Sequence, residues 1–272
     1  MTHLVSVVIP TFNRAKLVSR AIDTALSQSV PTEVVLCDHG STDETPEVAK
    51  RYGDRIRYVR KDIDQGPIAC WQDGIEHATG EFVHINYDDD WISPEFVERT
   101  LPLMRDDVAF VYTRATIHTD GIEKTETLLG HPAGIRPVKD IVRYLLRTEV
   151  SISPGCALFR KRDLQKNLLA EVPGASGIYG KKTGVGEDLL VFLLTTLHYP
   201  YYAHLAEPLA HFLSHPTSIT TNAIESGKKQ ALTDAYTVAK QYYLSQQGSV
   251  SRRPGLLGWW DRKRWKRDGL AR

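Results

Sequence analysis

Short apolar runs rich in β-branched residues alternate with helix-patterned segments over the first 113 residues, and this alternation limits the fold more than any other feature. In the segments between the runs, apolar residues recur every three or four positions, as on the buried side of a helix. Because helices commonly connect parallel strands, the alternation predicts an α/β fold with a mostly parallel central sheet flanked by helices. The expected strands cover residues 4–9, 33–37, 56–59, 82–85 and 108–112, and the expected helices cover 15–26, 45–52, 68–78 and 94–104.

The pattern is less regular beyond Thr113. A hairpin is expected over residues 116–127 around Asp120-Gly121, and residues 174–186 are expected to form a glycine-rich loop. The remaining expected elements are helices over 138–147, 186–197 and 225–247 and strands over 156–160, 201–205 and 209–213.

Composition places the chain among soluble globular proteins. Of its 272 residues, 42% are hydrophobic and 25% are charged, and the formal net charge is +1, so no overall preference for nucleic acid is expected. The three cysteines are far apart and lack paired spacing, which supports neither a disulfide framework nor a zinc site. No signal-like N-terminus and no apolar run of about 18 residues is found, so we expect a cytoplasmic protein.

Three consecutive carboxylates follow the expected strand 82–85, at Asp88, Asp89 and Asp90. The carboxyl ends of strands are where open α/β sheets bind ligands. Adjacent carboxylates raise one another's pKa unless a cation lies among them, and oxygen ligands suit a hard divalent ion. Taken alone, the triplet fits an acidic turn before a helix equally well.

The loops after the first two expected strands lack nucleotide-cofactor fingerprints. A GxGxxG motif is absent after the first strand, and residues 174–181 miss the phosphate-loop spacing, which argues against dinucleotide oxidoreductases and P-loop kinases. The loops instead read Pro-Thr-Phe-Asn-Arg over residues 10–14 and Asp-His-Gly-Ser-Thr-Asp over residues 38–43. Such residues in isolation are typical of turns and helix caps.

Five segments in register point to one family. They are VSVVIPTFNR near the start, CDHGSTDET about 30 residues later, GEFVHINYDDDWISPEF, GEDLL and EPLAHFLSHPTSIT. With these segments the sequence resembles the inverting family 2 glycosyltransferases of the GT-A fold, over residues 4–220. The resemblance implies a single GT-A (Rossmann-like) domain over 1–222, with a nucleotide-sugar-binding half (1–113) and an acceptor-binding half (114–222). A C-terminal helix (223–248) and a basic, Trp-rich tail (249–272) would follow.

The resemblance also implies roles for individual residues. A general base for the acceptor hydroxyl is implied at Asp188, with Glu187 contacting the acceptor or positioning the base. Metal ligands are implied at Asp89, the principal one, and at Asp88, Asp90 and His215. Nucleotide-sugar contacts are implied at Pro10, Thr11, Asn13, Arg14, Asp38, Gly66 and Asp88.

The sequence departs from the family pattern at three positions. Tyr87 stands where the first Asp of the family's Asp-x-Asp-Asp falls, so the division of metal and ribose roles within the triplet stays open. His39 replaces a second Asp, which leaves the base specificity open. Leu213 stands where an Arg is common, which weakens a phosphate clamp there.

The activity implied is metal-dependent, inverting transfer of a sugar from a nucleotide diphosphate sugar to an acceptor hydroxyl. A UDP-sugar is the expected donor, Mn²⁺ or Mg²⁺ the expected cofactor, and a glycan or lipid-linked molecule the expected acceptor. Two other classes remain open. A nucleotidyltransferase acting on a sugar phosphate normally needs a glycine-rich basic loop that residues 10–14 do not supply, and a non-catalytic nucleotide- or glycan-binding module would not need Asp188.

The tail over residues 249–272 contains eight basic and two acidic residues. Its net charge is therefore +6, and the rest of the chain carries −5. Trp259, Trp260 and Trp265 lie among these charges, a mixture found where proteins contact anionic membrane surfaces. Peripheral association with the cytoplasmic face of a membrane is one interpretation. A disordered basic tail and a nucleic-acid contact are the other two, and no nucleic-acid partner is expected for the chain as a whole.

Overall fold

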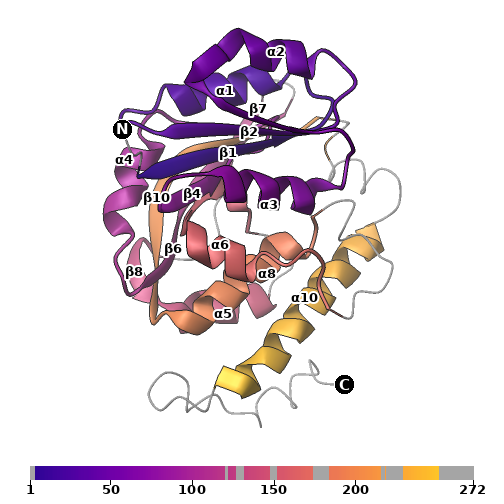
Figure 1. Cartoon of the computed structure of the whole chain (residues 1–272). Coiled ribbons are helices and arrows are strands. Elements are labelled where there is room, and N and C mark those ends of the chain that lie inside the picture. Colours follow the sequence, from indigo (N-terminus) through magenta and orange to yellow (C-terminus); the bar gives the residue numbers. More distant parts are fainter. Residues whose placement is uncertain are drawn as a thin grey trace.

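A mixed β-sheet forms the centre of the protein and helices cover both of its faces (Figure 1). The structure is a computed structural model that describes residues 4–119, 122–126, 132–147, 152–173, 184–215, 218 and 229–250. Strand order along the sheet is β3-β2-β1-β4-β9-β6-β10-β5, with β7 paired to β6 and β8 paired to β10. The strands are β1 (Val5–Thr11), β2 (Glu33–His39), β3 (Arg57–Lys61), β4 (Phe82–Ile85), β5 (Trp91–Ile92), β6 (Val108–Thr119), β7 (Ile122–Glu126), β8 (Gly134–Pro137), β9 (Ala157–Arg160) and β10 (Tyr201–Leu213).

The helices lie in two groups on opposite faces of the sheet. In Figure 1, α1 and α2 lie on one side of β1 and β2, and α3, α6 and α8 lie on the other. The helices are α1 (Val18–Leu26), α2 (Thr45–Tyr52), α3 (Pro67–His77), α4 (Phe96–Thr100), α5 (Val138–Arg147), α6 (Lys161–Asn167), α8 (Glu187–Thr195) and α10 (Lys229–Val250). Short 3-10 turns occupy Gly53–Arg55, Leu101–Leu103, Pro154–Cys156 and Thr196–His198.

Alternating residues of β1 divide the core into two layers. Val7 and Ile9 pack in the layer that includes α1 and α2, whereas Val8 packs with Ile68 and Trp71 of α3 in the other layer. Successive side chains of a strand point to opposite faces, so a strand buried on both sides must be apolar throughout. Each Val or Ile buried in this way contributes roughly 1.5–3 kcal/mol to folding.

The predicted α/β class is confirmed, and the parallel arrangement holds for the first four strands. β3, β2, β1 and β4 are parallel neighbours, which brings the carboxyl ends of β1, β2 and β4 to one edge of the sheet. The other half of the sheet is mixed. β9 runs antiparallel between β4 and β6, whereas β10 is parallel to β6.

Several predicted elements differ from the observed ones. The two strands expected over 201–205 and 209–213 form one strand, β10, which stays paired with β6 through register shifts near Pro208. The helix expected over 94–104 is shorter, with α4 followed by a 3-10 turn. β5, β8 and α6 were not predicted, because each is short and carries little apolar periodicity.

The predicted hairpin is confirmed, since β6 and β7 pair antiparallel, although Asp120 and Gly121 lie outside the described residues. Most of the expected glycine-rich loop, residues 174–183, also lies outside them, as does the tail from residue 251. The expected C-terminal helix is present as α10, which packs against α8. Across the described part of the chain, every helix is too short or too polar to cross a bilayer.

Candidate active site

The acidic triplet forms a turn at the carboxyl end of β4. The backbone N–H of Asp90 donates to the carbonyl of Tyr87 at 3.1 Å, so the chain reverses within four residues. β5 begins at the next residue and pairs antiparallel with β10. The turn is therefore held at both ends by the sheet, and its three carboxylates are fixed relative to one another.

Each carboxylate of the triplet contacts a different part of the chain. Asp88 Oδ1 lies 3.6 Å from Nε of Arg14, in the loop after β1. Asp89 Oδ2 lies 3.0 Å from Nε2 of His215, just beyond β10. Asp90 Oδ1 accepts the backbone N–H of Leu213 at 2.9 Å. The triplet thus brings together the ends of three strands, and the predicted grouping of Arg14, the three aspartates and His215 is present.

The triplet is electrostatically strained. Burial raises the pKa of Asp88 and of Asp90, and the charge of Asp89 between them raises both pKa values further. Arg20 of α1 offsets part of this charge, because its Nη2 donates to the backbone carbonyl of Asp89 at 2.8 Å. The Arg20 guanidinium also lies 3.6 Å from the centre of the Trp91 ring, a cation–π contact that orients it.

The donor set of the triplet suits a hard divalent cation. Carboxylate oxygens are the preferred ligands of Mg²⁺, and Mn²⁺ also accepts an imidazole nitrogen. Asp88 and Asp90 have raised pKa values, and Asp89 lies beside the His215 imidazole. A cation among the three carboxyl groups would stabilise their ionised forms. The chemistry of these donors therefore suits the predicted metal, and Asp89 and His215 are the two of them in direct contact.

Side-chain hydrogen bonds tie the loop after β1 to the loop after β2. The backbone N–H of Asn13 donates to Ser41 Oγ at 2.9 Å, and Asn13 Oδ1 accepts the N–H of Thr42 at 2.8 Å. Asn13 has a φ of 55°, a left-handed conformation that Asn tolerates better than most residues. Asn13 therefore acts as a clip that fixes the shape of both loops.

Asp38 is fully buried at the carboxyl end of β2. Its Oδ2 accepts from the Tyr58 hydroxyl and from Arg60 Nη1, both at 2.7 Å, and its Oδ1 accepts the N–H of Ser41 at 2.9 Å. Asp38 therefore organises Tyr58 and Arg60 at this edge of the sheet. In register beside it, Pro10 pairs with Cys37 and Thr11 pairs with Asp38.

Gly66 lies at the start of α3, separate from the contacts of the triplet. Its φ of 90° favours glycine, and its N–H donates to Asp64 Oδ1 at 2.7 Å. This geometry accounts for glycine as the residue before the helix, and its predicted contact with the nucleotide sugar remains a prediction.

Asp188 is held in the first turn of α8. Its Oδ1 accepts the backbone N–H groups of Gly186 at 2.9 Å and Leu189 at 2.7 Å, and the Tyr236 hydroxyl of α10 donates to its Oδ2 at 3.2 Å. Burial raises the pKa of Asp188 to about 6, although these donors favour the charged form. Asp188 is therefore more basic than an ordinary carboxylate and still mostly ionised at neutral pH.

Glu187 differs from its neighbour in being almost completely buried, with 1% of its surface exposed. Among the described residues, neither carboxylate oxygen has a hydrogen-bond partner. Burial raises the pKa of Glu187 to about 7, and the charge of Asp188 contributes to the rise. The effect of burial exceeds that of the nearby backbone N–H groups, which lower the pKa, so Glu187 carries the cost of a buried acid.

Tyr87 connects the triplet to Asp188. Its hydroxyl is 3.4 Å from Ser153 Oγ, and its ring lies 5.4 Å from that of Trp71, centre to centre. Burial raises the pKa of Tyr87 well above its usual value, and the charges of Asp188 and Asp90 raise it further. Both acids are thus close enough to act on one phenol, which places the triplet and Asp188 around a common region.

Four contributors to the site were not predicted: Arg20, Trp91, Tyr236 and the pair formed by Tyr58 and Arg60. Trp91 follows the triplet directly, so its position in the sequence was a usable signal. Arg20 and Tyr236 lie in helical segments where a basic or aromatic residue is common, and only the tertiary packing brings them to the site.

Comparisons with known proteins identify the family and the fold. The sequence profile of glycosyl transferase family 2 matches residues 6–168, more than half of the chain. The chain belongs to glycosyl transferase family 2, and its fold is the GT-A fold of that family. Among solved structures, S. aureus TarS 1-349 superposes with a TM-score of 0.61 at 18% identity, covering 93% of this chain and 75% of TarS 1-349.

A second solved structure is the mannosyltransferase PcManGT from Pyrobaculum calidifontis, in complex with GDP-Man and Mn²⁺. It has a TM-score of 0.53 at 17% identity and covers 94% of this chain and 77% of PcManGT. At these identities the two structures support the fold alone.

Two curated relatives match part of the chain. Chondroitin synthase of Pasteurella multocida (strain Pm70) is 37% identical over 126 residues, which cover 43% of this chain and 13% of the synthase. The GalNAc(5)-diNAcBac-PP-undecaprenol beta-1,3-glucosyltransferase of Campylobacter jejuni is 31% identical over 121 residues, 43% of this chain and 39% of that enzyme. The chain therefore spans well under half the length of each relative.

Proposed function

We propose that the protein is a metal-dependent, inverting glycosyltransferase that moves a sugar from a nucleotide diphosphate sugar to an acceptor hydroxyl. The observation that carries the proposal is that two acidic centres, the triplet after β4 and Asp188 in the first turn of α8, both act on the Tyr87 hydroxyl. Sugar transfer with inversion needs charge neutralisation at the departing diphosphate and a base at the attacking hydroxyl. The two centres supply one function each.

The donor half of the site is built by the loops after β1 and β2. Arg14 carries a positive charge beside the triplet, and Arg60 is partly exposed at the end of β3. These groups suit the nucleoside and diphosphate of a UDP-sugar, with Thr11, Asn13 and Asp38 shaping the pocket. A UDP-GlcNAc complex of S. aureus TarS, which shares the fold, supports this choice of nucleotide.

The divalent metal, Mn²⁺ or Mg²⁺, would be held by the triplet and His215. When bound, it would neutralise negative charge on the leaving diphosphate. Asp89 is the principal ligand in this proposal, because Asp90 Oδ1 is occupied by the Leu213 N–H and Asp88 is opposite Arg14. Arg20 fixes the backbone of the turn, so that the carboxylates keep their spacing.

Asp188 is the proposed general base. Two backbone N–H groups hold its Oδ1 and the Tyr236 hydroxyl contacts its Oδ2, so the carboxylate is oriented before an acceptor binds. A base with a pKa of about 6 is ionised at neutral pH and takes a proton more readily than an ordinary Asp. Glu187, buried beside it, is proposed to position the base or the acceptor.

The proposed acceptor is a hydroxyl group of a glycan. This glycan is either free or linked to a lipid. The Campylobacter jejuni relative is named for an undecaprenol-linked acceptor, which supports the lipid-linked version. The basic, Trp-rich tail would then bring the enzyme to an anionic surface at the cytoplasmic face of a membrane. Each Lys or Arg near such a surface contributes about 1 kcal/mol, and salt screens the attraction.

The tail proposal predicts a specific difference in vesicle binding. The full chain should sediment with anionic vesicles at low salt and not with neutral ones, whereas a chain truncated after Gln247 should sediment with neither. Equal behaviour of the two chains would contradict membrane docking, and so would binding of the full chain to nucleic acid alone. Neither result would affect the proposed sugar transfer.

A screen of nucleotide sugars tests the proposed reaction. Metal-dependent release of a nucleoside diphosphate, fastest with one UDP-sugar and accelerated by a glycan acceptor, is the expected result. Release of pyrophosphate from a nucleoside triphosphate and a sugar phosphate would identify a nucleotidyltransferase instead. Tight binding of nucleotide sugars with no turnover for any acceptor would favour a binding module.

A further inference from the structure

A buried cluster of two thiols and one imidazole lies beneath the loops of the donor site. Cys37, His39 and Cys70 each offer a ligand atom, and these atoms lie within 4.8 Å of one another. The three side chains belong to residues with 0%, 1% and 4% of their surface exposed. Sequence spacing argued against a zinc site, but it does not reveal that α3 packs directly on β2.

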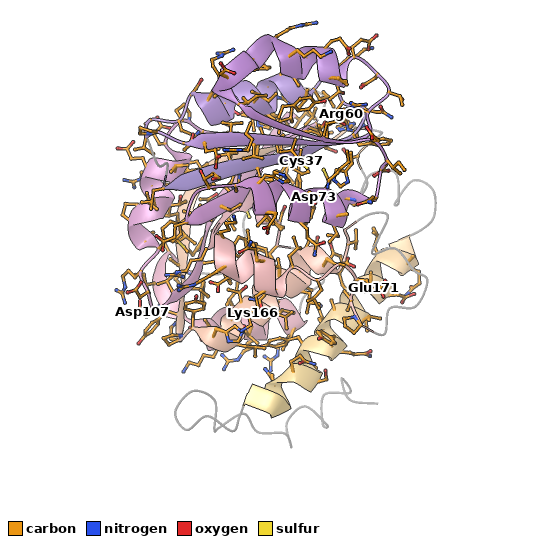
Figure 2. All side chains as sticks on the ribbon, in the orientation of Figure 1. Cys37, Arg60, Asp73, Asp107, Lys166 and Glu171 are labelled. Carbon is orange, nitrogen blue, oxygen red and sulfur yellow. The ribbon has the colours of Figure 1, made fainter. Side chains whose placement is uncertain are left out.

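The cluster follows from the periodicities of one strand and one helix. Cys37 and His39 are two residues apart on β2, so their side chains share a face of the sheet. α3 covers that face, and Cys70 and Asp73 are three residues apart on one side of the helix. Figure 2 labels Cys37 on the sheet and Asp73 on the helix beside it.

Asp73 orients the imidazole of His39. Its Oδ2 lies 3.0 Å from His39 Nε2 and 3.3 Å from Nζ of Lys61. Because the Asp73 carboxylate accepts a hydrogen bond at Nε2, the neutral imidazole carries its proton on Nε2. The other ring nitrogen, Nδ1, then has a lone pair. Within the described structure Nδ1 has no hydrogen-bond partner, although it is buried. A histidine that binds a metal through one ring nitrogen usually donates the N–H of its other nitrogen to a carboxylate or carbonyl. Asp73 and His39 have this arrangement.

The thiols of Cys70 and Cys156 both donate to a backbone carbonyl, that of Cys70 to Cys37 at 3.1 Å, and burial raises both pKa values. Cys156 is buried alone, its thiol donates to the Ser153 carbonyl at 3.0 Å, and burial raises its pKa to about 12. Cys37 differs, because the neighbouring Cys70 thiol and His39 lower its pKa. The cluster therefore differs from Cys156 in having the imidazole of His39 within 4.8 Å of two thiols.

The spacing of the cluster suits a tetrahedral ion. Zinc–sulfur bonds of about 2.3 Å and zinc–nitrogen bonds of about 2.0 Å hold ligand atoms roughly 3.5–3.8 Å apart. Atoms already within 4.8 Å of one another need to approach by at most about 1.3 Å to reach these separations. Two thiolates and an imidazole also match the preference of zinc for soft sulfur and nitrogen donors over the carboxylate oxygens of the triplet.

We propose that Cys37, His39 and Cys70 bind one zinc ion, with Asp73 as the positioning residue behind His39. The fourth position of the ion is left to a small ligand such as water, and each thiol gives up its proton on binding. The ion would join the carboxyl end of β2 to α3 directly behind Asp38. Because α3 packs on both β1 and β2, the zinc would brace the donor loops from below, separately from the triplet metal.

Cobalt titration of the full chain, stripped of metal and kept reduced, tests the proposal. Co²⁺ in a thiolate site produces an intense sulfur-to-metal absorption that carboxylate ligands do not give. One equivalent of Co²⁺ should produce this band in the wild-type protein, and zinc should abolish it by displacement. Asp89→Ala should keep the band, which separates this site from the triplet.

Matched variants identify the ligands. Cys37→Ser and Cys70→Ser should lose most of the band, whereas Cys156→Ser should keep it. Asp73→Asn keeps all three ligands and should weaken cobalt binding by about 10- to 100-fold. Absence of a thiolate band in the wild-type protein would overturn the proposal. This measurement uses no variant, so it holds even if the cysteine variants fail to fold. An undiminished band in folded Cys37→Ser and Cys70→Ser would overturn it as well.

Discussion

Asp89 Oδ2 and His215 Nε2 are 3.0 Å apart although 126 positions separate the two residues in the chain. The contact joins the turn after β4, which belongs to the parallel half of the sheet, to the segment after β10, which belongs to the mixed half. His215 therefore completes the acidic triplet only when the mixed half of the sheet has formed. The parallel and the mixed halves of the sheet meet at this pair.

Replacing Asp188 tests the role of general base. Asp188→Asn keeps the shape of the side chain but removes its basicity, so the rate of transfer should fall by roughly 10²- to 10⁴-fold while donor affinity is unchanged. Turnover with a competent acceptor and calorimetry with the donor measure the two effects. Near wild-type turnover in this variant would assign the base to another residue.

The loss of activity at low pH should follow from the raised pKa of Asp188. Because the base must be ionised, kcat/KM should fall as the pH drops through about 6, instead of near the ordinary Asp value. Tyr236→Phe removes a donor that favours the ionised form, so this fall should move to higher pH. Tyr242→Phe on the same helix is the control. Equal pH profiles for the two variants would show that the Tyr236 hydroxyl does not influence the pKa of Asp188.

Glu187 should lower the stability of the folded protein at high pH. Its pKa is raised from 4.5 to about 7, so the folded state favours the protonated form, and stability is lost as the pH rises from 4.5 through 7. Glu187→Gln cannot ionise, and at pH 8 it should raise the free energy of unfolding by up to about 3 kcal/mol. Urea unfolding at pH 5 and pH 8 measures the effect.

The gain from Glu187→Gln should be much smaller at pH 5 than at pH 8, because the wild-type carboxyl is then largely protonated in the folded state. Glu95→Gln, at an exposed position, is the matched control and should change little at either pH. A gain of equal size at both pH values would show that the amide acts by packing and not by removing a buried charge.

The first half of the fold was predictable because its signals are local. Each strand of β1, β2 and β4 is a short apolar run, and its polar loop follows immediately, so the triplet could be placed at a strand end from the sequence alone. The contacts that define the site are not local. Leu213 donates to Asp90 across 123 positions, and Tyr236 donates to Asp188 from a helix of its own.

The mixed half of the sheet was harder to predict for a physical reason. Glu207 and Pro208 break the apolar pattern of β10, but pairing with β6 continues past them through a shift of register, which only the partner strand determines. β8 is bounded by Gly134 and Pro137 and resembles a loop in sequence. The cysteine cluster was missed for a similar reason, since Cys37 and Cys70 come together only through packing of α3 on β2.

The affinity for UDP with and without Mn²⁺, compared between wild type and Asp89→Ala, tests whether the acidic triplet holds the donor through a metal ion. Calorimetry should show that Mn²⁺ strengthens UDP binding to the wild-type protein and to Asp107→Ala, whose exposed carboxylate pairs with Arg105 just before the start of β6. In Asp89→Ala, with an unchanged circular dichroism spectrum, the effect of Mn²⁺ should disappear. An unchanged effect of Mn²⁺ in the folded variant would contradict the claim that the triplet holds the donor through a metal.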